Sequence, residues 1–231
     1  MARLVNTWTT LLSLRVCRAA PVVGAVLLLG GCTAPTLGGG DAGGIYTAVK
    51  QMWTGNNKKV TLEEAAAVPY ASMGIRVGNS TETMIILASD TGGPLLWTAG
   101  AGIAITTRDG RIVRTAGLSH NLGGYEPGSV SLGADGVRST RWQADFPDLK
   151  LYSVAIACRS RPAVDETIII LGKDIQTRRI NESCSTEGSG LDWSFDNTYW
   201  LDPSSGLVWR SIQHVHPLLD AIETEILRPP Y

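Results

Sequence analysis

The fold class is decided by the stretch from Ile103 to Thr115, which reads IAITTRDGRIVRT. The runs on either side of Asp109-Gly110 are short and rich in apolar and β-branched residues, as strands are. Asp109-Gly110 is a residue pair that tolerates the positive φ angles of a two-residue hairpin turn. The stretch therefore predicts an antiparallel β-hairpin.

Similar signals extend the β prediction along the chain. Short apolar or β-branched runs, separated by Gly, Asn, Ser and Asp, predict further strands at 73–77, 83–88, 95–98, 151–159, 167–171, 176–180 and 222–226. The stretch DPSSG at 202–206 predicts the turn of a second hairpin. We therefore expect a mainly β fold class, with antiparallel β-sheets built from hairpins and one or two short N-terminal helices.

The two helices are expected before the first strand. Apolar residues recur at helical spacing within residues 45–53, and Thr61 begins a capping box, TLEE, followed by three alanines. Residues 119–136 are glycine-rich and polar, and they predict a loop with little regular structure. A second polar loop is expected at 181–190.

The N-terminus has the layout of a lipoprotein signal peptide. Residues 1–31 contain three arginines, no acidic residue and an apolar run that ends in LGG before Cys32. The run is far shorter than the roughly 18 residues that a spanning helix needs. We expect cleavage before Cys32, lipidation of Cys32 and anchoring to a membrane outside the cytoplasm. Residues 32–44 then form a glycine-rich tether, and 45–231 the β-rich domain.

The net charge bears on the kinds of partner that the protein binds, and the number of cysteines bears on the redox state of its compartment. Loss of the three leader arginines leaves a formal charge of about −4, which gives no reason to expect a nucleic-acid partner. Cys17 leaves with the leader and Cys32 takes the lipid, so Cys158 and Cys184 remain as an even pair in an oxidising compartment. We expect them to form a disulfide. The rival interpretation is a catalytic or metal-binding cysteine, although neither lies in a close Cys/His cluster.

Tryptophan is the commonest aromatic residue, with seven in the chain against six tyrosines and two phenylalanines. Trp193, Trp200 and Trp209 lie in one segment and are candidate contacts for a glycan or a protein partner. Packing in the core is the alternative, because large aromatic side chains dominate burial energetics.

Three histidines are candidates for catalysis or metal binding. His214 and His216 are two residues apart, on a predicted strand or just after its end, so their side chains point the same way as those of a metal-ligating pair can. However, no third candidate ligand has a spacing typical of a metal site. His120 suits a general base, but the chain has no Gly-x-Ser-x-Gly motif and no identifiable orienting carboxylate. We therefore expect no metal site, no cofactor and no catalytic triad.

Three aspartates near tryptophans raise the possibility of a glycosidase. Aromatic side chains of the kind that stack on sugars lie near Asp192, Asp196 and Asp202 in the sequence, as they lie near the carboxylates of glycosidases. Aspartates beside Asn, Pro, Ser and Gly are more often turn formers. We assign no catalytic residues, and we expect the chain not to be an enzyme.

Several stretches together resemble one family of lipoproteins. They are the lipobox at Cys32, PYASM at 69–73, DGRIVRTAGL at 109–118, YW at 199–200, WRSIQ at 209–213 and EILRPP at 225–230. In this order they resemble the YjbF/GfcB lipoproteins associated with group 4 capsule and exopolysaccharide operons. The resemblance covers most of the chain after Cys32, and it carries over no catalytic residue.

The resemblance implies an outer-membrane lipoprotein on the periplasmic side that works with neighbouring export proteins in polysaccharide production or secretion. Thr33 and Ala34 after Cys32 fit this location, because they lack the aspartate that signals inner-membrane retention. We expect a non-enzymatic accessory factor with a membrane partner through its lipid, export proteins as further partners, and polysaccharide as a candidate ligand. The alternatives are a periplasmic polysaccharide-modifying enzyme and an envelope structural lipoprotein unrelated to sugars.

Overall fold

The structure, a computed structural model, describes residues 58–100, 102–133 and 137–230. Every described residue belongs to one compact unit of the chain. The predicted signal peptide, Cys32, the tether and the helix at 45–53 lie outside the described residues. Within the described ranges, no helix has the length and apolarity needed to cross a membrane.

The described residues form one 13-stranded sheet in which every strand pairing is antiparallel. This result confirms the predicted mainly β fold class. The strands are β1 (Ser72–Val77), β2 (Thr83–Ser89), β3 (Leu95–Ala99), β4 (Ile103–Arg108), β5 (Arg111–Ala116), β6 (Gly124–Leu132), β7 (Arg138–Phe146), β8 (Leu151–Ser160), β9 (Val164–Ile170), β10 (Lys173–Glu187), β11 (Ser194–Leu201), β12 (Val208–Gln213) and β13 (Ile222–Arg228).

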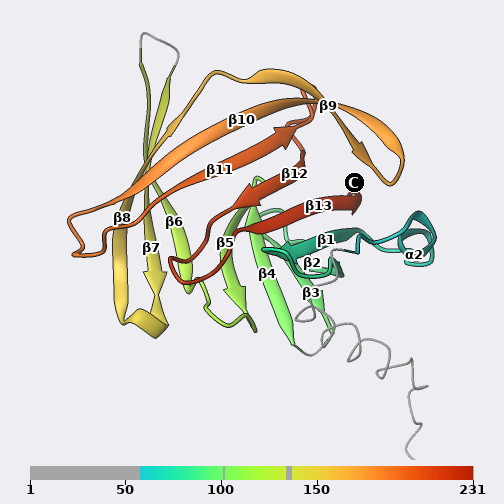
Figure 1. The fold of residues 1–231 in the computed structure, drawn as a ribbon, viewed down its shortest axis with the longest axis horizontal. Coiled ribbons are helices and arrows are strands. Elements are labelled where there is room, and N and C mark those ends of the chain that lie inside the picture. The colour runs from blue at the N-terminus through green and yellow to red at the C-terminus, as the bar shows by residue number, and fades with distance from the viewer. Residues whose placement is uncertain (1–57, 101, 134–136, 231) are drawn as a thin grey trace, which may run out of the picture. The chain divides into compact units, whose positions relative to one another are not determined.

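The strands follow the order β5-β4-β3-β2-β1-β13-β12-β11-β10-β8-β7-β6, and β9 pairs with β10 beside this path. Figure 1 shows the long β10 running across the view above β11, β12 and β13. The sheet curls until strands from its two ends approach each other. Arg108 of β4 lies 3.5 Å from Glu126 of β6, and the Thr115 N–H donates to the Leu122 carbonyl at 3.0 Å.

Curling gives the sheet an inner face, which carries the main core. The largest fully buried apolar side chains of this core are Trp97, Phe146, Ile75, Ile85, Ile105, Ile112, Ile156 and Ile222. Because alternate residues of a strand point to opposite faces, most strands present apolar residues to this interior. Ile168 and Ile170 of β9 instead form a second, smaller cluster with Trp200.

Both predicted hairpins are confirmed. Asp109 (φ 50°) and Gly110 (φ 75°) form the β4–β5 turn with the positive φ angles that the sequence indicated. A Cβ atom on Gly110 would lie 2.3 Å from Cγ2 of Val208, so this turn also requires a residue without a side chain. In the β11–β12 turn, Asp202 accepts hydrogen bonds from the Ser204 and Ser205 N–H groups.

The predicted capping box at Thr61 is also confirmed. Thr61 Oγ1 accepts from the Glu64 N–H at 3.2 Å, and the Glu64 carboxylate accepts from the Thr61 N–H at 2.8 Å. These bonds begin the short helix α2 (Leu62–Ala66). The described chain also has one 3₁₀ turn, η1 (Pro147–Leu149), between β7 and β8.

The prediction of a loop over 119–136 was wrong, because β6 occupies Gly124–Leu132 and pairs with β7. The glycines and Pro127 of this stretch suggested a loop. However, β6 is an edge strand, where a proline without an N–H is tolerated, and its register shifts between Pro127 and Val130. A bulged edge strand therefore carries the loop-like sequence.

Two details of the predicted disulfide region were also wrong. Cys184 lies inside β10, which continues through Glu187 instead of giving way to a loop at 181. This part of β10 pairs with both β8 and β11. Its polar residues Ser183 and Ser185 are exposed on the outward face. The alternation of a strand predicts that Tyr152 shares the buried face of β8 with Val154, Ile156 and Cys158. However, Tyr152 is 63% exposed. The positive φ angle of Ser153 (52°) interrupts the alternation of the strand at that point.

Candidate functional site: an arginine-lined cleft on the inner face

An open cleft of about 470 Å³ lies between the β4–β5 hairpin and strands β7, β10 and β11. Its polar and aromatic lining includes Arg108, Arg111, Arg138, Arg161, Trp142, Tyr199, Asp109 and Glu182. The volume is within the range of about 300–1,000 Å³ that small-molecule sites span.

The floor of the cleft is an ion pair between Arg111 and Glu182. Arg111 Nη2 donates to Glu182 Oε2 at 2.6 Å, and the two side chains are 13% and 3% exposed. Asn197 Nδ2 also donates to Glu182 Oε2, at 3.4 Å. Glu182 faces inward because it lies on the same side of β10 as Ile180 and Cys184. A carboxylate on this buried face requires a charged partner, and Arg111 supplies it from the hairpin across the cleft.

Three aromatic rings surround the Arg111 guanidinium. Its Cζ atom lies 4.6 Å from the ring centroid of Trp142, 5.2 Å from that of Tyr199 and 5.5 Å from that of Tyr125. Burial raises the pKa of both tyrosine hydroxyls, so these rings stay neutral at physiological pH. The aromatic faces attract the cation and hold it in one position.

The rim of the cleft carries further arginines. Arg108 makes a long ion pair of 3.5 Å with the exposed Glu126. Arg138 and Arg161 are exposed, and neither side chain has an ion-pair or hydrogen-bond partner in the described part of the chain. The register of β7 and β8 pairs Arg138 with Ser160, the residue before Arg161, so the two arginines lie at the same end of the cleft. Guanidinium groups thus outnumber carboxylates in the lining.

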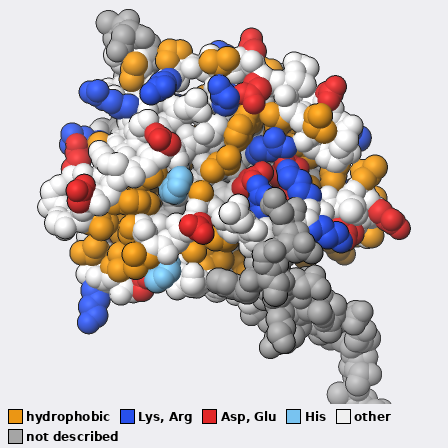
Figure 2. All heavy atoms as spheres, in the orientation of Figure 1, with side chains coloured by type: hydrophobic (Ala, Val, Ile, Leu, Met, Phe, Trp, Pro, Cys, Tyr) orange, Lys and Arg blue, Asp and Glu red, His pale blue; other side chains and the backbone are white. Residues whose placement is uncertain are grey.

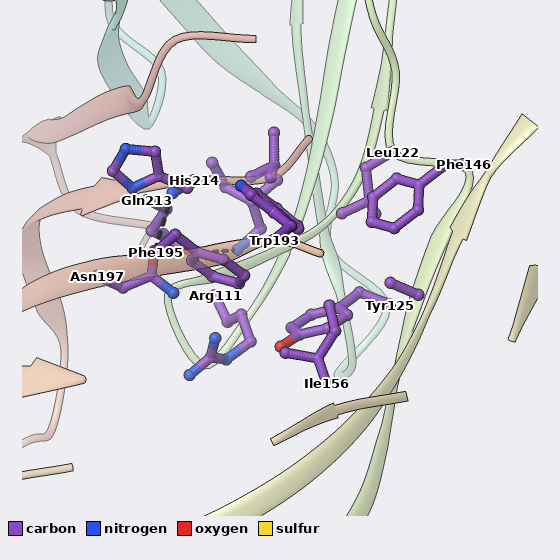
Figure 3. Close-up of a pocket in the computed structure, with 13 residues that line it drawn as sticks. Arg111, Leu122, Tyr125, Phe146, Ile156, Trp193, Phe195, Asn197, Gln213 and His214 are labelled. Atoms are coloured by element: carbon purple, nitrogen blue, oxygen red, sulfur yellow. Dashed lines mark hydrogen bonds between the residues drawn. The ribbon is translucent and has the colours of Figure 1, made fainter. Parts of the chain in front are cut away.

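A second, much smaller cavity adjoins Arg111 on the inner face. It has a volume of about 20 Å³, which is room for about one water molecule and not for a sugar ring. Figure 3 shows Trp193 and Phe195 side by side in its wall, and their rings stack at 4.0 Å. This cavity is a packing feature of the core.

The three tryptophans proposed from the sequence lie away from the cleft lining. Trp200 is 8% exposed and packs with Ile168 and Ile170, and Trp193 and Trp209 are half-buried against the core. The indole N–H groups of Trp200 and Trp209 are buried and have no partner among the described residues. Contact of these three side chains with glycan or partner stays a prediction. The tryptophan that lines the cleft is Trp142, which the sequence analysis did not single out.

Cys158 and Cys184 form a disulfide in the structure. The two residues are directly opposite each other in β8 and β10, with Cα atoms 4.0 Å apart. In the same register, the inward-facing neighbours Ser160 and Glu182 form the next pair on this face. The disulfide therefore fixes the β8–β10 pairing immediately beside the cleft floor.

A hydrogen-bonded cluster of His120, Asp148 and His216 lies outside the cleft, where three loops meet. Asp148 Oδ2 lies 2.7 Å from His120 Nδ1, and its Oδ1 lies 3.0 Å from His216 Nε2. No carboxylate that orients His120 is identifiable in the sequence, and in the structure Asp148 is that carboxylate. Sequence reasoning missed it because 28 residues and two strands separate the pair.

The protonation of His216 decides what this cluster can do. His216 Nδ1 accepts from the Leu218 N–H at 3.1 Å, so the neutral ring carries its proton on Nε2 and donates it to Asp148. Burial lowers the pKa of His216, against the opposing effect of Asp148. Burial raises the pKa of Asp148, but the hydrogen bonds from both histidines outweigh it and the pKa is lowered. These hydrogen bonds hold the loops of the cluster together. They suit this structural role, which we call the His216 clamp, better than a metal centre, since a metal ion would need Nε2 of His216 unprotonated.

His214 does not join His216 in a ligand set. His214 Nδ1 lies 2.8 Å from the Asp196 carbonyl, whereas His216 bonds Asp148. The glycosidase candidates are likewise engaged locally: Asp196 accepts from Ser183 Oγ, and the turn hydrogen bonds lower the pKa of Asp202. Asp192 is exposed.

A second buried charge cluster lies on the outer face, where the segment from Lys58 to Val60 crosses β1 and β13. Glu225 is 4% exposed and accepts from Arg210 Nη2 at 2.6 Å and Lys59 Nζ at 3.1 Å. Glu223 pairs with Arg76, and Glu82 accepts from the Val60 N–H at 2.7 Å. Burial raises the pKa of Glu82. Figure 2 shows basic and acidic side chains mingled over β12, β13 and β1.

The fold and the cleft define a class of protein: a single curled antiparallel sheet with an arginine-lined concavity. Residues 45–227 match the family described as group 4 capsule polysaccharide lipoprotein gfcB, YjbF. The chain belongs to this YjbF family of capsule polysaccharide lipoproteins, which confirms the resemblance found in the sequence. The family places the chain among membrane-anchored proteins of the cell envelope.

Two individual proteins support this assignment. The chain is 24% identical over 182 residues to the uncharacterized lipoprotein GfcB of Escherichia coli K12, covering 75% of this chain and 84% of that protein. It also resembles the crystal structure of the hypothetical lipoprotein YmcC from Escherichia coli K12, with a TM-score of 0.58 and 20% identity. That match covers 80% of this chain and 94% of the YmcC chain, and it shows the shared fold.

Proposed function

We propose that this chain is a non-enzymatic accessory lipoprotein of capsule or exopolysaccharide production. It is anchored through Cys32 to the periplasmic face of the outer membrane and works there with export proteins. The observation that carries this proposal is the family match, which spans nearly the whole described sheet. The lipobox before Cys32 and the residues Thr33 and Ala34 support the anchor and its location.

The chemistry of the cleft supports the non-enzymatic part of the proposal. Glycoside hydrolysis needs a pair of carboxyl groups, one to donate a proton and one to act as base or nucleophile. Glu182 is committed to Arg111 and Asn197, and Asp109 occupies a hairpin turn. The remaining groups of the lining that carry charge are arginines, which bind anions but do not exchange protons near neutral pH.

The role is tested by deleting the gene in the native host and measuring polysaccharide on the surface and in the periplasm. We expect less polymer on the surface, with polymer retained in the periplasm if the defect is in export. Unchanged amounts in both places would contradict the proposed role. Complementation with the wild-type gene serves as the control.

The anchor is tested by fractionation. We expect the wild-type protein in the outer-membrane fraction of a sucrose gradient and a Cys32→Ala variant outside it. Recovery of the wild-type protein in the inner-membrane fraction would contradict the proposed location.

The His120–Asp148–His216 cluster is the observation that favours the alternative, a periplasmic enzyme. It provides a base oriented by a carboxylate, but among the described residues neither histidine is hydrogen-bonded to a Ser, Thr or Cys side chain. If the protein were an enzyme that used this cluster, an Asp148→Asn variant present at normal levels would fail to restore polysaccharide production in the deletion strain. We expect that variant to restore production fully.

A further inference from the structure

We propose that the inner-face cleft binds a carboxylate-bearing segment of polysaccharide, with Arg111 on its floor and Arg138 and Arg161 on its rim. This inference rests on the proposed function, and it adds a binding site and a ligand class to it. The ligand is defined by its chemistry: a sugar chain whose carboxylate groups meet guanidinium groups.

Arg111 has hydrogen-bonding capacity that its internal partner does not use. A guanidinium offers five N–H donors in a fixed fork, and in the described chain Arg111 donates to one carboxylate oxygen, Glu182 Oε2. The side chain keeps 13% of its surface exposed, and it lines the open cleft. Its aromatic neighbours hold the guanidinium in place, so little ordering is needed when an anion arrives.

Among the described residues, no acid balances the charge of the rim arginines Arg138 and Arg161. Arg138 and Arg161 lie at one end of the cleft and are unpaired in the described chain, as shown above. The entire chain is slightly acidic, with a formal charge of −1, so this positive surface is a local feature. Arginine is the side chain best suited to bidentate recognition of carboxylates.

The remaining lining favours a sugar chain over an acidic peptide. Trp142 is half-buried, and Pro127, Pro162 and Val208 continue the apolar surface along the cleft. Apolar side chains interleaved with guanidinium groups match the C–H faces and carboxylates of acidic sugars. The volume of about 470 Å³ suits a short segment of a polymer, which can leave the cleft at its open side.

The test is calorimetric titration of the lipidated protein in detergent with polygalacturonate oligomers. The matched ligand control is the same oligomers with their carboxylates reduced to alcohols. We expect binding of the acidic form that weakens as salt rises, and at least tenfold weaker binding of the reduced form. Equal binding of the two forms, or no binding of either, would overturn the proposal. Tight binding of poly-glutamate in place of the glycan would also overturn it and would indicate an acidic protein partner.

Variants locate the site. Arg138→Ala/Arg161→Ala should weaken binding of the acidic oligomers at least tenfold. Arg159→Ala/Arg228→Ala removes the same charge from two exposed arginines outside the cleft lining, and it should change binding less than twofold. Equal losses in both variants would refute the cleft as the site. The result is independent of the deletion experiment: binding without a polysaccharide phenotype would contradict only the proposed function, and a phenotype without binding would contradict only this inference.

Discussion

The sheet carries a buried charge cluster on each face, and the two differ in balance. On the outer face, Glu225 is enclosed by Arg210 and Lys59, and Arg210 also donates to the Ile169 carbonyl of β9. On the inner face, Glu182 is the one acidic partner of Arg111 among the described residues, and the described lining of the cleft contains more arginines than acids.

The difference indicates separate roles. The outer cluster joins elements far apart in the sequence: Lys59 precedes the first strand, while Glu225 lies in the last. The acidic and basic side chains of this cluster pair with one another, so the cluster acts as a clamp that holds these elements together. The inner cluster leaves N–H donors of Arg111 unused beside an open cleft, as in a binding site. Breaking the outer cluster should therefore affect stability alone, and breaking the inner cluster should affect both stability and binding.

The largest effect is expected from Glu225→Gln. Removing this carboxylate leaves the largely buried Arg210 uncompensated, which should lower the free energy of unfolding by about 3 to 5 kcal/mol. Chemical denaturation measures this loss in the free energy of unfolding. The control is Asp165→Asn, which removes a 92% exposed partner of Arg178 and should cost less than about 1 kcal/mol. Equal small losses in both variants would show that the outer cluster is not a clamp.

The next effect concerns the disulfide beside the inner cluster. Cys158→Ser/Cys184→Ser should lower the free energy of unfolding by about 2 to 4 kcal/mol, because the unfolded chain gains freedom over a separation of 26 residues. Unfolded, non-reduced wild-type protein with Cys32 lipidated or replaced should show no free thiol. Titration of two thiols there would contradict the pairing.

Glu182→Gln should separate stability from binding. It leaves Arg111 without its acidic partner and should destabilise the protein by about 2 to 3 kcal/mol. The same change removes the carboxylate that competes with a ligand for Arg111, so binding of acidic oligomers should tighten about threefold or more. Glu225→Gln should leave binding unchanged. Weaker binding in Glu182→Gln would mean that Glu182 positions the ligand and does not compete with it.

The smallest effect concerns pH and the His216 clamp. Because burial lowers the pKa of His216 in the folded state, the unfolded chain takes up this proton at higher pH. Stability should therefore fall as the pH drops below about 6.5, the ordinary histidine pKa. His216→Gln should flatten this slope, and the half-exposed His214→Gln should not. Parallel slopes in both variants and the wild type would exclude His216 as the source.

The sequence predicted the parts of the fold that depend on neighbouring residues. The Asp109-Gly110 hairpin and the Thr61 capping box are local, because a turn or a cap is decided within about four positions. β6 was missed because edge-strand bulges use the same glycine and proline signals as loops. Sheet order and curvature depend on pairings such as β1 with β13, which local patterns do not encode.

The candidate site was less predictable. Arg111 and Glu182 are 71 positions apart, and His216 and Asp148 are 68 apart, so no spacing connects them. One local signal was present. Glu182 alternates with Ile180 and Cys184, and a carboxylate on a buried strand face requires a partner from elsewhere in the fold.

The central claim is that the inner cleft is the part of this lipoprotein that serves polysaccharide production. It is tested most directly by complementing the deletion strain with Arg138→Ala/Arg161→Ala and measuring surface polysaccharide at matched protein levels. We expect this allele to restore little surface polymer, whereas Arg159→Ala/Arg228→Ala restores the wild-type amount. Full restoration by Arg138→Ala/Arg161→Ala would contradict the claim.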